Sequence, residues 1–144
     1  MTKETLMTQH YYGTKFVTAW PQEKDGQPGY AVKYEDGYIS WSPLNVFLKS
    51  YQPLTAMSFG HAIKALKAGR KVARAGWNGK DMWLVYVSGT PAVKMQRGSA
   101  YHDAGVTEAD IRPHIDMFTA HGQMQPGWVA SQNDMLAEDW MVVE

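Results

Sequence analysis

The stretch that decides the fold is PGWVASQNDMLAEDWMVVE, residues 126–144, which combines a tight turn, two tryptophans, a polar run and a closing apolar segment. Its Pro-Gly pair predicts a turn that holds Trp128 in a fixed place. The polar run Ser131–Asp134 offers hydroxyl, amide and carboxylate groups that can bond a backbone turn or a polar ligand. Trp140–Val143 is typical of a strand. The tail therefore predicts a sheet strand that anchors a polar cluster.

One amphipathic helix is predicted upstream of this tail. Ser58 is a suitable N-cap, and Gly69 is a suitable stop. Between them the apolar residues with i, i+3, i+4, i+7 spacing are Phe59, Ala62, Ile63 and Leu66. His61 stands where Glu or Gln would complete a capping box, so we expect a weakened cap and a surface histidine. Short strands are predicted at 70–74, 82–87 and 115–120.

Residues 1–53 predict a small β-rich module with a short helix. Aromatic and β-branched residues favour strands at 11–20, 29–34 and 38–41, with a hairpin turn at Asp36–Gly37. Ser42 as N-cap and Pro43 as first helical residue predict the helix. After a linker, residues 57–144 form a second domain. The predicted class is α+β, a mainly antiparallel sheet with one principal helix.

The segment 88–114 is the least regular part of the second domain and has the character of an insertion. Pro91, Gly98 and Gly105 interrupt it. Thr107 followed by Glu108 is typical of a capped helix start, so we predict one helical turn over 107–111.

Composition excludes several classes of function. Fourteen basic and fourteen acidic residues balance to zero formal charge, which disfavours nucleic acid and anionic membranes as partners. The chain has no cysteine and no apolar run long enough to span a membrane, so we expect an intracellular protein without disulfides. Six tryptophans and eight tyrosines are many for 144 residues, and we expect some to line a pocket or interface.

The residues offer little support for an enzyme or a metal protein. A metal site from His102, His114 and His121 is conceivable, but no paired-histidine helical spacing exists. A catalytic carboxylate pair could come from Asp134, Glu138 and Asp139, although carboxylates beside a strand more often cap or face solvent. We therefore expect no catalysis, no metal and no cofactor.

The strand predicted at 82–87 is apolar at every position and needs cover on both faces. In a chain this short, one cover can be another subunit, which predicts a homo-oligomer. Alternatively, the strand faces the N-terminal module.

Three stretches together resemble a known family. They are MSFGHAIKALKAGRKVARAGWNGKDMWLVYV, IDMFTAHGQ and GWVASQNDMLAEDWMVV, and they resemble the phage family named Thoeris anti-defence protein 2 over about residues 57–144. The resemblance implies a homo-oligomer, dimer or tetramer, that sequesters glyco-cyclic ADP-ribose, an immune signal made by TIR-domain proteins of Thoeris, without degrading it. It also implies action in the cytoplasm of the infected bacterial host.

A protein that sequesters a nucleotide in this way, called a sponge, needs aromatic side chains that stack on the base. It also needs short polar side chains and some positive charge around the ligand. By resemblance the pocket lies at a subunit interface. Its expected residues are Phe59, Gly60, Arg74, Trp77, Asn78, Lys80, Trp128, Ser131, Gln132 and Asp134. Two alternatives stay open, namely a sponge for the cyclic di- or oligonucleotides of CBASS-type immunity and a module that docks a host protein.

Overall fold

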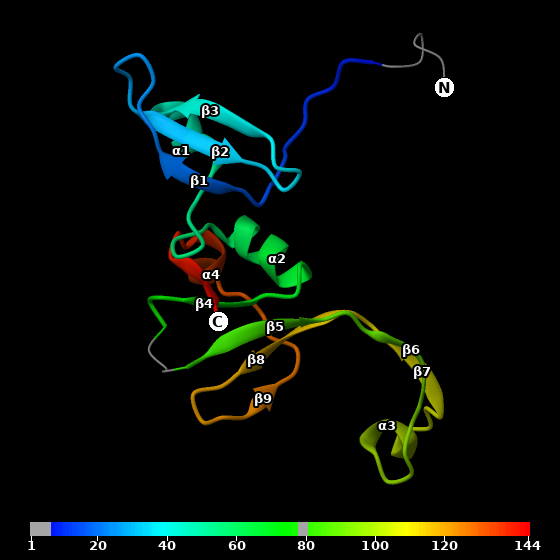
Figure 1. The fold of residues 1–144 in the computed structure, drawn as a ribbon. Helices are drawn as coiled ribbons and strands as arrows, with labels where there is room; N and C mark the ends of the chain where they lie inside the picture. The colour runs from blue at the N-terminus through cyan, green and yellow to red at the C-terminus, as the bar shows by residue number, and fades with distance from the viewer. Residues whose placement is uncertain (1–6, 78–80) are drawn as a thin grey trace. The chain divides into compact units, whose positions relative to one another are not determined.

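The computed structural model describes residues 7–77 and 81–144, and the chain divides into two compact units (Figure 1). The N-terminal unit is Met1–Tyr51 and the C-terminal unit is Gln52–Glu144. The described residues form four helices and ten strands, and all the strand pairs are antiparallel. The expected α+β class with mainly antiparallel sheet is confirmed. No helix in the described ranges is both long and apolar enough to cross a membrane.

The N-terminal unit is a three-stranded meander followed by a short helix. Its elements are β1 (Thr18–Pro21), β2 (Gly29–Lys33), β3 (Ile39–Pro43) and α1 (Leu44–Ser50). The predicted hairpin turn joins β2 to β3, with Gly37 at a φ of 91°. The Phe47 ring of α1 stacks on Tyr30 of β2 at 4.1 Å between centroids. This stack holds the helix on the sheet.

Two local predictions for this unit were wrong. The strand expected from residue 11 begins only at Thr18. Ser42 does not cap α1, because it still pairs with Tyr30 in the sheet and Pro43 occupies the N-cap position. Strand β3 thus extends to Pro43, two residues beyond the strand end predicted from the sequence, and α1 begins only at Leu44.

The C-terminal unit is built on a five-stranded sheet of order β10-β4-β5-β8-β9. Its strands are β4 (Lys71–Arg74), β5 (Trp83–Val87), β8 (His114–Phe118), β9 (Met124–Gln125) and β10 (Trp140–Val143). Helix α2 (Phe59–Lys67) packs on one face, across β10, β4 and β5. The short helix α4 (Gln132–Leu136) lies next to α2. The tail strand predicted at residues 140–143 is confirmed as β10.

The core lies between α2 and the sheet. Its fully buried members are Met57, Ala62, Leu66, Val72, Leu84 and Trp140. Ala62 and Leu66 belong to the predicted apolar stripe, which is therefore confirmed. The backbones of Met57 and Trp140 exchange hydrogen bonds of 2.6 and 3.1 Å, so the start of the unit is fastened to β10.

A two-stranded arm extends from the end of β5 and returns to the start of β8 (Figure 1). We use "the arm" for residues 89–112, which contain β6 (Thr90–Lys94), α3 (Ala100–Asp103) and β7 (Glu108–Ile111). The helical turn predicted over 107–111 was wrong, because these residues pair with β6. At the root, Gly89 has a φ of 89° and an added Cβ would lie 2.5 Å from the Ile111 carbonyl oxygen, so a glycine is required there.

The N-terminus of α2 has a cap built from two separate parts of the chain. The Ser58 hydroxyl accepts the His61 backbone N–H at 3.4 Å, as predicted. The amide oxygen of Gln52 accepts the Ser58 backbone N–H at 2.7 Å and lies 2.8 Å from His61 Nδ1. Gln52 thus does what a capping-box glutamate would do, and because its oxygen is an acceptor, His61 donates from Nδ1.

Replacing Gln52 by alanine should therefore destabilise the C-terminal unit. The loss of two hydrogen bonds at the cap is expected to lower the free energy of unfolding by about 1–2 kcal/mol. Urea unfolding followed by tryptophan fluorescence measures this change. Gln96→Ala, an exposed glutamine of the arm, is the control. Equal unfolding midpoints for the two variants would contradict this role of Gln52.

Candidate functional site

Arg74 is the centre of an ion-pair cluster that joins three segments. Its Nη1 donates to Asp134 Oδ1 of α4, and its Nε donates to Asp139 Oδ1 just before β10, both at 2.9 Å. The Gly76 backbone N–H donates to Asp139 Oδ2 at 2.8 Å. Trp77 Nε1 donates to Asp134 Oδ1 at 3.3 Å. The cluster thereby fixes the turn after β4 against α4 and β10.

The polar run Ser131–Asp134 is a helix start. The Ser131 hydroxyl accepts the Asp134 backbone N–H at 3.1 Å, and Asp134 Oδ2 accepts the Ser131 backbone N–H at 3.0 Å. This reciprocal pair is a capping box, with Asp in the place of the usual Glu. Two of the predicted ligand groups are therefore already engaged in holding α4.

Four aromatic rings meet beside the ion-pair cluster. Trp140 is fully buried and lies 5.4 Å from Phe59, 5.4 Å from Trp77 and 6.1 Å from Trp128, measured between ring centroids. Its Nε1 donates to the Asp134 carbonyl oxygen at 2.8 Å. The structure thus brings together three predicted aromatic site residues, and it does so around Trp140, which sequence reasoning gave only as a strand residue.

The electrostatics of the cluster favour ionised carboxylates. The guanidinium of Arg74 lowers the pKa of Asp139, and the Gly76 N–H adds to this shift. Partial burial raises the pKa of Asp134, but hydrogen bonds from Ser131, Arg74 and Trp77 outweigh it and leave the pKa lowered. In turn, Asp139 and Asp134 raise the pKa of Arg74. One guanidinium between two carboxylates leaves an excess of one negative charge.

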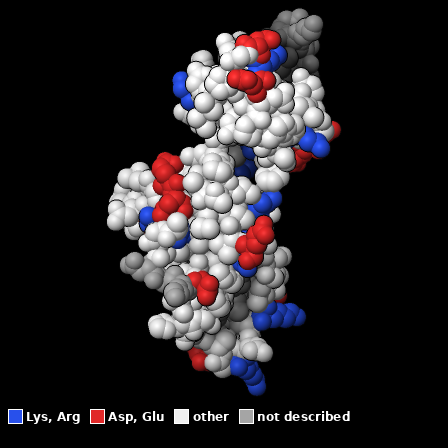
Figure 2. Space-filling model, turned by 60° about the vertical axis from the view of Figure 1, so that its left-hand side comes forward, with Lys and Arg blue, Asp and Glu red and all other residues white. Residues whose placement is uncertain are grey.

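The remaining predicted site residues are less informative. Gly60 and Gln132 are exposed at the starts of α2 and α4. Asn78 and Lys80 lie outside the described residues. On the face shown in Figure 2, acidic and basic side chains are interspersed, without a continuous basic patch.

A cavity of about 440 Å³ is lined in part by Trp128, and sequence reasoning missed it. Most of the side chains that line it are apolar. Its lining comes from α2, β5, the start of β8 with the residue before it, and the loop before α4: Ile63, Leu66, Lys67, Tyr86, Pro113, His114, Ile115, Gly127, Trp128 and Val129. No motif signals such a cavity, because its wall is assembled from four separate stretches of sequence.

The residues considered for chemistry are placed as follows. His114 Nε2 lies 3.4 Å from Asp116 Oδ2, and the described residues contain no group of three potential ligands arranged to hold a metal ion. Glu138 accepts a hydrogen bond from Gln52 Nε2 at 3.0 Å. The three carboxylates considered for catalysis, Asp134, Glu138 and Asp139, thus all take part in contacts that hold the fold.

Acid should weaken this cluster. Because folding lowers the pKa of Asp134 and Asp139, their ion pairs stabilise the protein above the ordinary pKa of about 4, and this stabilisation is lost as the pH falls towards the lower folded values. We expect the melting temperature of the wild type to fall more between pH 6 and about 3 than that of Asp139→Asn. Differential scanning fluorimetry provides the measurement. Glu23→Gln, an exposed carboxylate of the N-terminal unit, should keep the wild-type slope, and a wild-type slope for Asp139→Asn would refute the role of the pair.

Comparison with known proteins agrees with the resemblance seen in the sequence. Residues 57–143 match the family described as Thoeris anti-defense 2-like domain. The protein named Thoeris anti-defense 2 from Bacillus phage SP01 is 39% identical over 89 residues, which are 62% of this chain and 97% of that protein. The family match includes the arm and the whole ion-pair cluster, so the arm lies within the family domain. The chain therefore belongs to the Thoeris anti-defense 2-like family and has the anti-defence role for which that family is named.

Proposed function

We propose that this protein binds glyco-cyclic ADP-ribose, the signal made by TIR-domain proteins of Thoeris, and sequesters it without degrading it. The observation that carries this proposal is the aromatic cluster of Phe59, Trp77 and Trp128 beside fixed hydrogen-bonding groups. The site acts inside the infected bacterium, where such a signal is produced. The family membership supports the anti-defence role, and the chemistry of the site supports the kind of ligand.

The aromatic side chains suit the purine of such a ligand. Trp77 is half-buried, so part of its indole remains accessible, and its ring is held edge-on against Trp128 and Trp140. A base stacked on an aromatic side chain contributes roughly 1–3 kcal/mol of binding free energy. A ring that is already fixed loses little conformational entropy on binding, which favours slow release.

The polar groups suit binding better than catalysis. A general acid must carry a proton near neutral pH, but the lowered pKa of Asp134 and of Asp139 keeps both carboxyl groups ionised. Arg74 is held by both of them and is not available as a free phosphate clamp. Ionised carboxylates and fixed backbone groups instead accept and donate hydrogen bonds to ribose hydroxyls and base edges.

A second candidate ligand class is the cyclic di- or oligonucleotides of CBASS-type immunity, which present the same base, ribose and phosphate groups. A protein partner is favoured by a different observation. The N-terminal unit exposes several large aromatic side chains, with Tyr11 at 82% and Tyr38 at 65% exposure. These residues lie outside the family match and are suited to docking a host protein.

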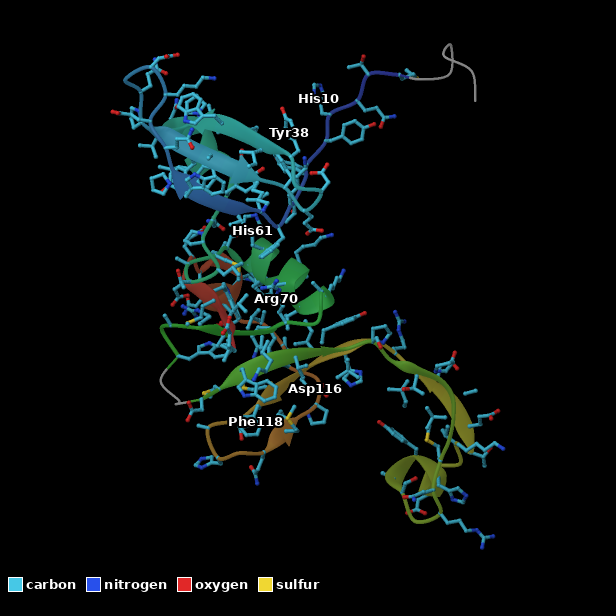
Figure 3. All side chains as sticks on the ribbon, in the orientation of Figure 1. His10, Tyr38, His61, Arg70, Asp116 and Phe118 are labelled. Carbon is cyan, nitrogen blue, oxygen red and sulfur yellow. The ribbon has the colours of Figure 1, made fainter. Side chains whose placement is uncertain are left out.

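We further propose that the protein is a homo-oligomer whose copies meet at the open face of the five-stranded sheet. Side chains alternate along β5, so Leu84 points to the core under α2, while Trp83 and Val85 point to the opposite face. There Trp83 stacks on Phe118 at 4.9 Å, and β8 carries Phe118 and Asp116 on the same side (Figure 3). Helix α2 packs on the core face of this sheet, and a second copy is the natural cover for the aromatic and aliphatic side chains of the open face.

Replacing Trp77 by alanine should weaken capture of the ligand. Loss of one stacking surface of roughly 1–3 kcal/mol is expected to raise the Kd for glyco-cyclic ADP-ribose by about 5- to 150-fold relative to the wild type. Isothermal titration calorimetry measures both values. Tyr38→Ala, an exposed aromatic residue of the N-terminal unit, is the matched control. Unchanged affinity in Trp77→Ala would remove this residue from the site, and no binding by the wild type would contradict the proposed ligand.

A charge on the open sheet face should separate the copies. Val85→Asp buries an unpaired carboxylate in the proposed interface, so we expect a lower molar mass than that of the wild type. Size-exclusion chromatography with light scattering gives the mass. Val46→Asp, at a half-exposed valine of α1, should keep the wild-type mass. A monomeric wild type would contradict the oligomer.

A further inference from the structure

The N-terminal unit lies outside the family match, and its small sheet has two edges. Figure 1 shows β2 between β1 and β3, so β1 and β3 are the edge strands. Strand β3 carries no charged side chain, whereas charged side chains are a common means by which proteins keep an edge from pairing with another chain. The edge at β3 is therefore suited to accept a further strand.

The hydrogen bonds between β2 and β3 show which backbone groups of β3 are free. The Tyr34 N–H donates to the Tyr38 carbonyl oxygen at one end of this pair of strands. Bonded and non-bonded pairs alternate along an antiparallel register, so the even-numbered residues of β3 bond to β2. Ile39 and Trp41 therefore direct their N–H and C=O groups away from β2. In the part of the chain that the structure describes, no hydrogen bond reaches these outward groups.

The side chains leave this edge open. The indole of Trp41 lies across the sheet, where a Cβ added to Gly29 of β2 would be 2.5 Å from the ring. Trp41 Nε1 donates to the Gln22 carbonyl oxygen, beyond the end of β1, at 2.7 Å, and this bond holds the ring in place. Ile39 is 52% exposed. An incoming strand can therefore reach the backbone of β3 without displacing a packed side chain.

The N-terminal unit also has little core of its own. Among its described residues, only Gly29, Ala31 and Val32 are buried. A unit of this size buries a small fraction of its surface and is correspondingly marginal in stability. A strand added beside β3 would extend the sheet and cover part of Ile39, so pairing with another chain would stabilise the unit.

We propose that this further strand is β3 of a second copy, paired antiparallel about a twofold axis that passes beside Ser40. The free groups of β3 complement themselves, because Ile39 of each copy then lies opposite Trp41 of the other and exchanges both backbone hydrogen bonds with it. Ser40 lies opposite Ser40 as a non-bonded pair. An uncharged strand also brings no like charges together when it pairs with itself.

This pairing goes beyond the proposed function, since it involves only the N-terminal unit and needs no ligand. It joins copies of the chain at a point outside the family domain. Together with the interface proposed at the open face of the five-stranded sheet, it gives each copy two separate points of attachment. Formation of one interface then raises the effective concentration for the other.

Disulfide trapping tests the register. In a non-bonded antiparallel pair the Cα atoms are about 4.5 Å apart, which a disulfide can bridge. The chain contains no cysteine, so Ser40→Cys should give a covalent dimer when the purified protein is oxidised with copper–phenanthroline. Ser42→Cys is the matched control, because its two copies would lie at least about 13 Å apart in this register. Equal dimer yields from the two variants would overturn the pairing and leave the edge to a strand of another protein.

Removal of an outward N–H tests whether backbone pairing brings the two Ser40 positions together. Ile39→Pro, made in the Ser40→Cys protein, removes a free donor but no bond to β2, so the dimer yield should fall to that of Ser42→Cys. Ala19→Pro is the control, because by the same alternation it removes an outward N–H from β1 at the opposite edge and should keep the yield. Thermal unfolding followed by circular dichroism shows whether each variant is folded. An unchanged yield in folded Ile39→Pro would overturn the proposal.

Discussion

The two hydrogen-bonded ion pairs of Arg74 hold the C-terminal unit in the arrangement on which its candidate site depends. Asp134 and Asp139 lie 60 and 65 residues after Arg74 in the sequence, and both bonds measure 2.9 Å. Through them the turn after β4, the start of α4 and the approach to β10 become one rigid surface. The indole N–H of Trp77 donates to the same Asp134 oxygen that accepts a hydrogen bond from Arg74, and this bond fixes the ring. A guanidinium that binds two carboxylates at once has the geometry for this task, which a lysine would lack.

The cluster also determines what the site can do. Its carboxylates are kept ionised by their partners, so they accept hydrogen bonds but do not donate protons to a leaving group. Its guanidinium is engaged, so positive charge for a phosphate has to come from elsewhere. Pre-organised aromatic rings and fixed acceptors favour tight capture over turnover, because their ordering costs little when the ligand arrives. The proposed function, in which the protein competes with an immune effector for a scarce signal, depends on this kind of slow release.

Local signals in the sequence were sufficient for the principal elements. Ser58 and the stripe through Leu66 predicted α2, and the apolar tail predicted β10. Long-range contacts account for the failures. Thr107 and Glu108 carry the local signals of a helix start, yet pairing with β6 makes this segment a strand. The five-residue α4 is too short for a periodic pattern, although its Ser131 and Asp134 spacing carries the signal of a capping box.

The sequence predicted most of the aromatic residues of the site, but not the long-range hydrogen bonds that hold it together. Residue types and the family resemblance named Phe59, Trp77 and Trp128, and the structure places them around one buried ring. Nothing local indicates that Arg74 is neutralised by two distant carboxylates, or that Gln52 completes the cap of α2. Both depend on which segments the sheet brings together.

The most direct test of the central claim follows the fate of the ligand. The protein is incubated with an equimolar amount of glyco-cyclic ADP-ribose for increasing times, the free ligand is removed, and the complex is heated to release what it holds. Chromatography with mass detection then identifies the released molecule. If the protein captures the ligand without degrading it, the heated complex should release intact ligand, in the same amount per protein at every incubation time. A product that accumulates with time would show an enzyme, and a complex that releases nothing would show that this nucleotide is not the ligand.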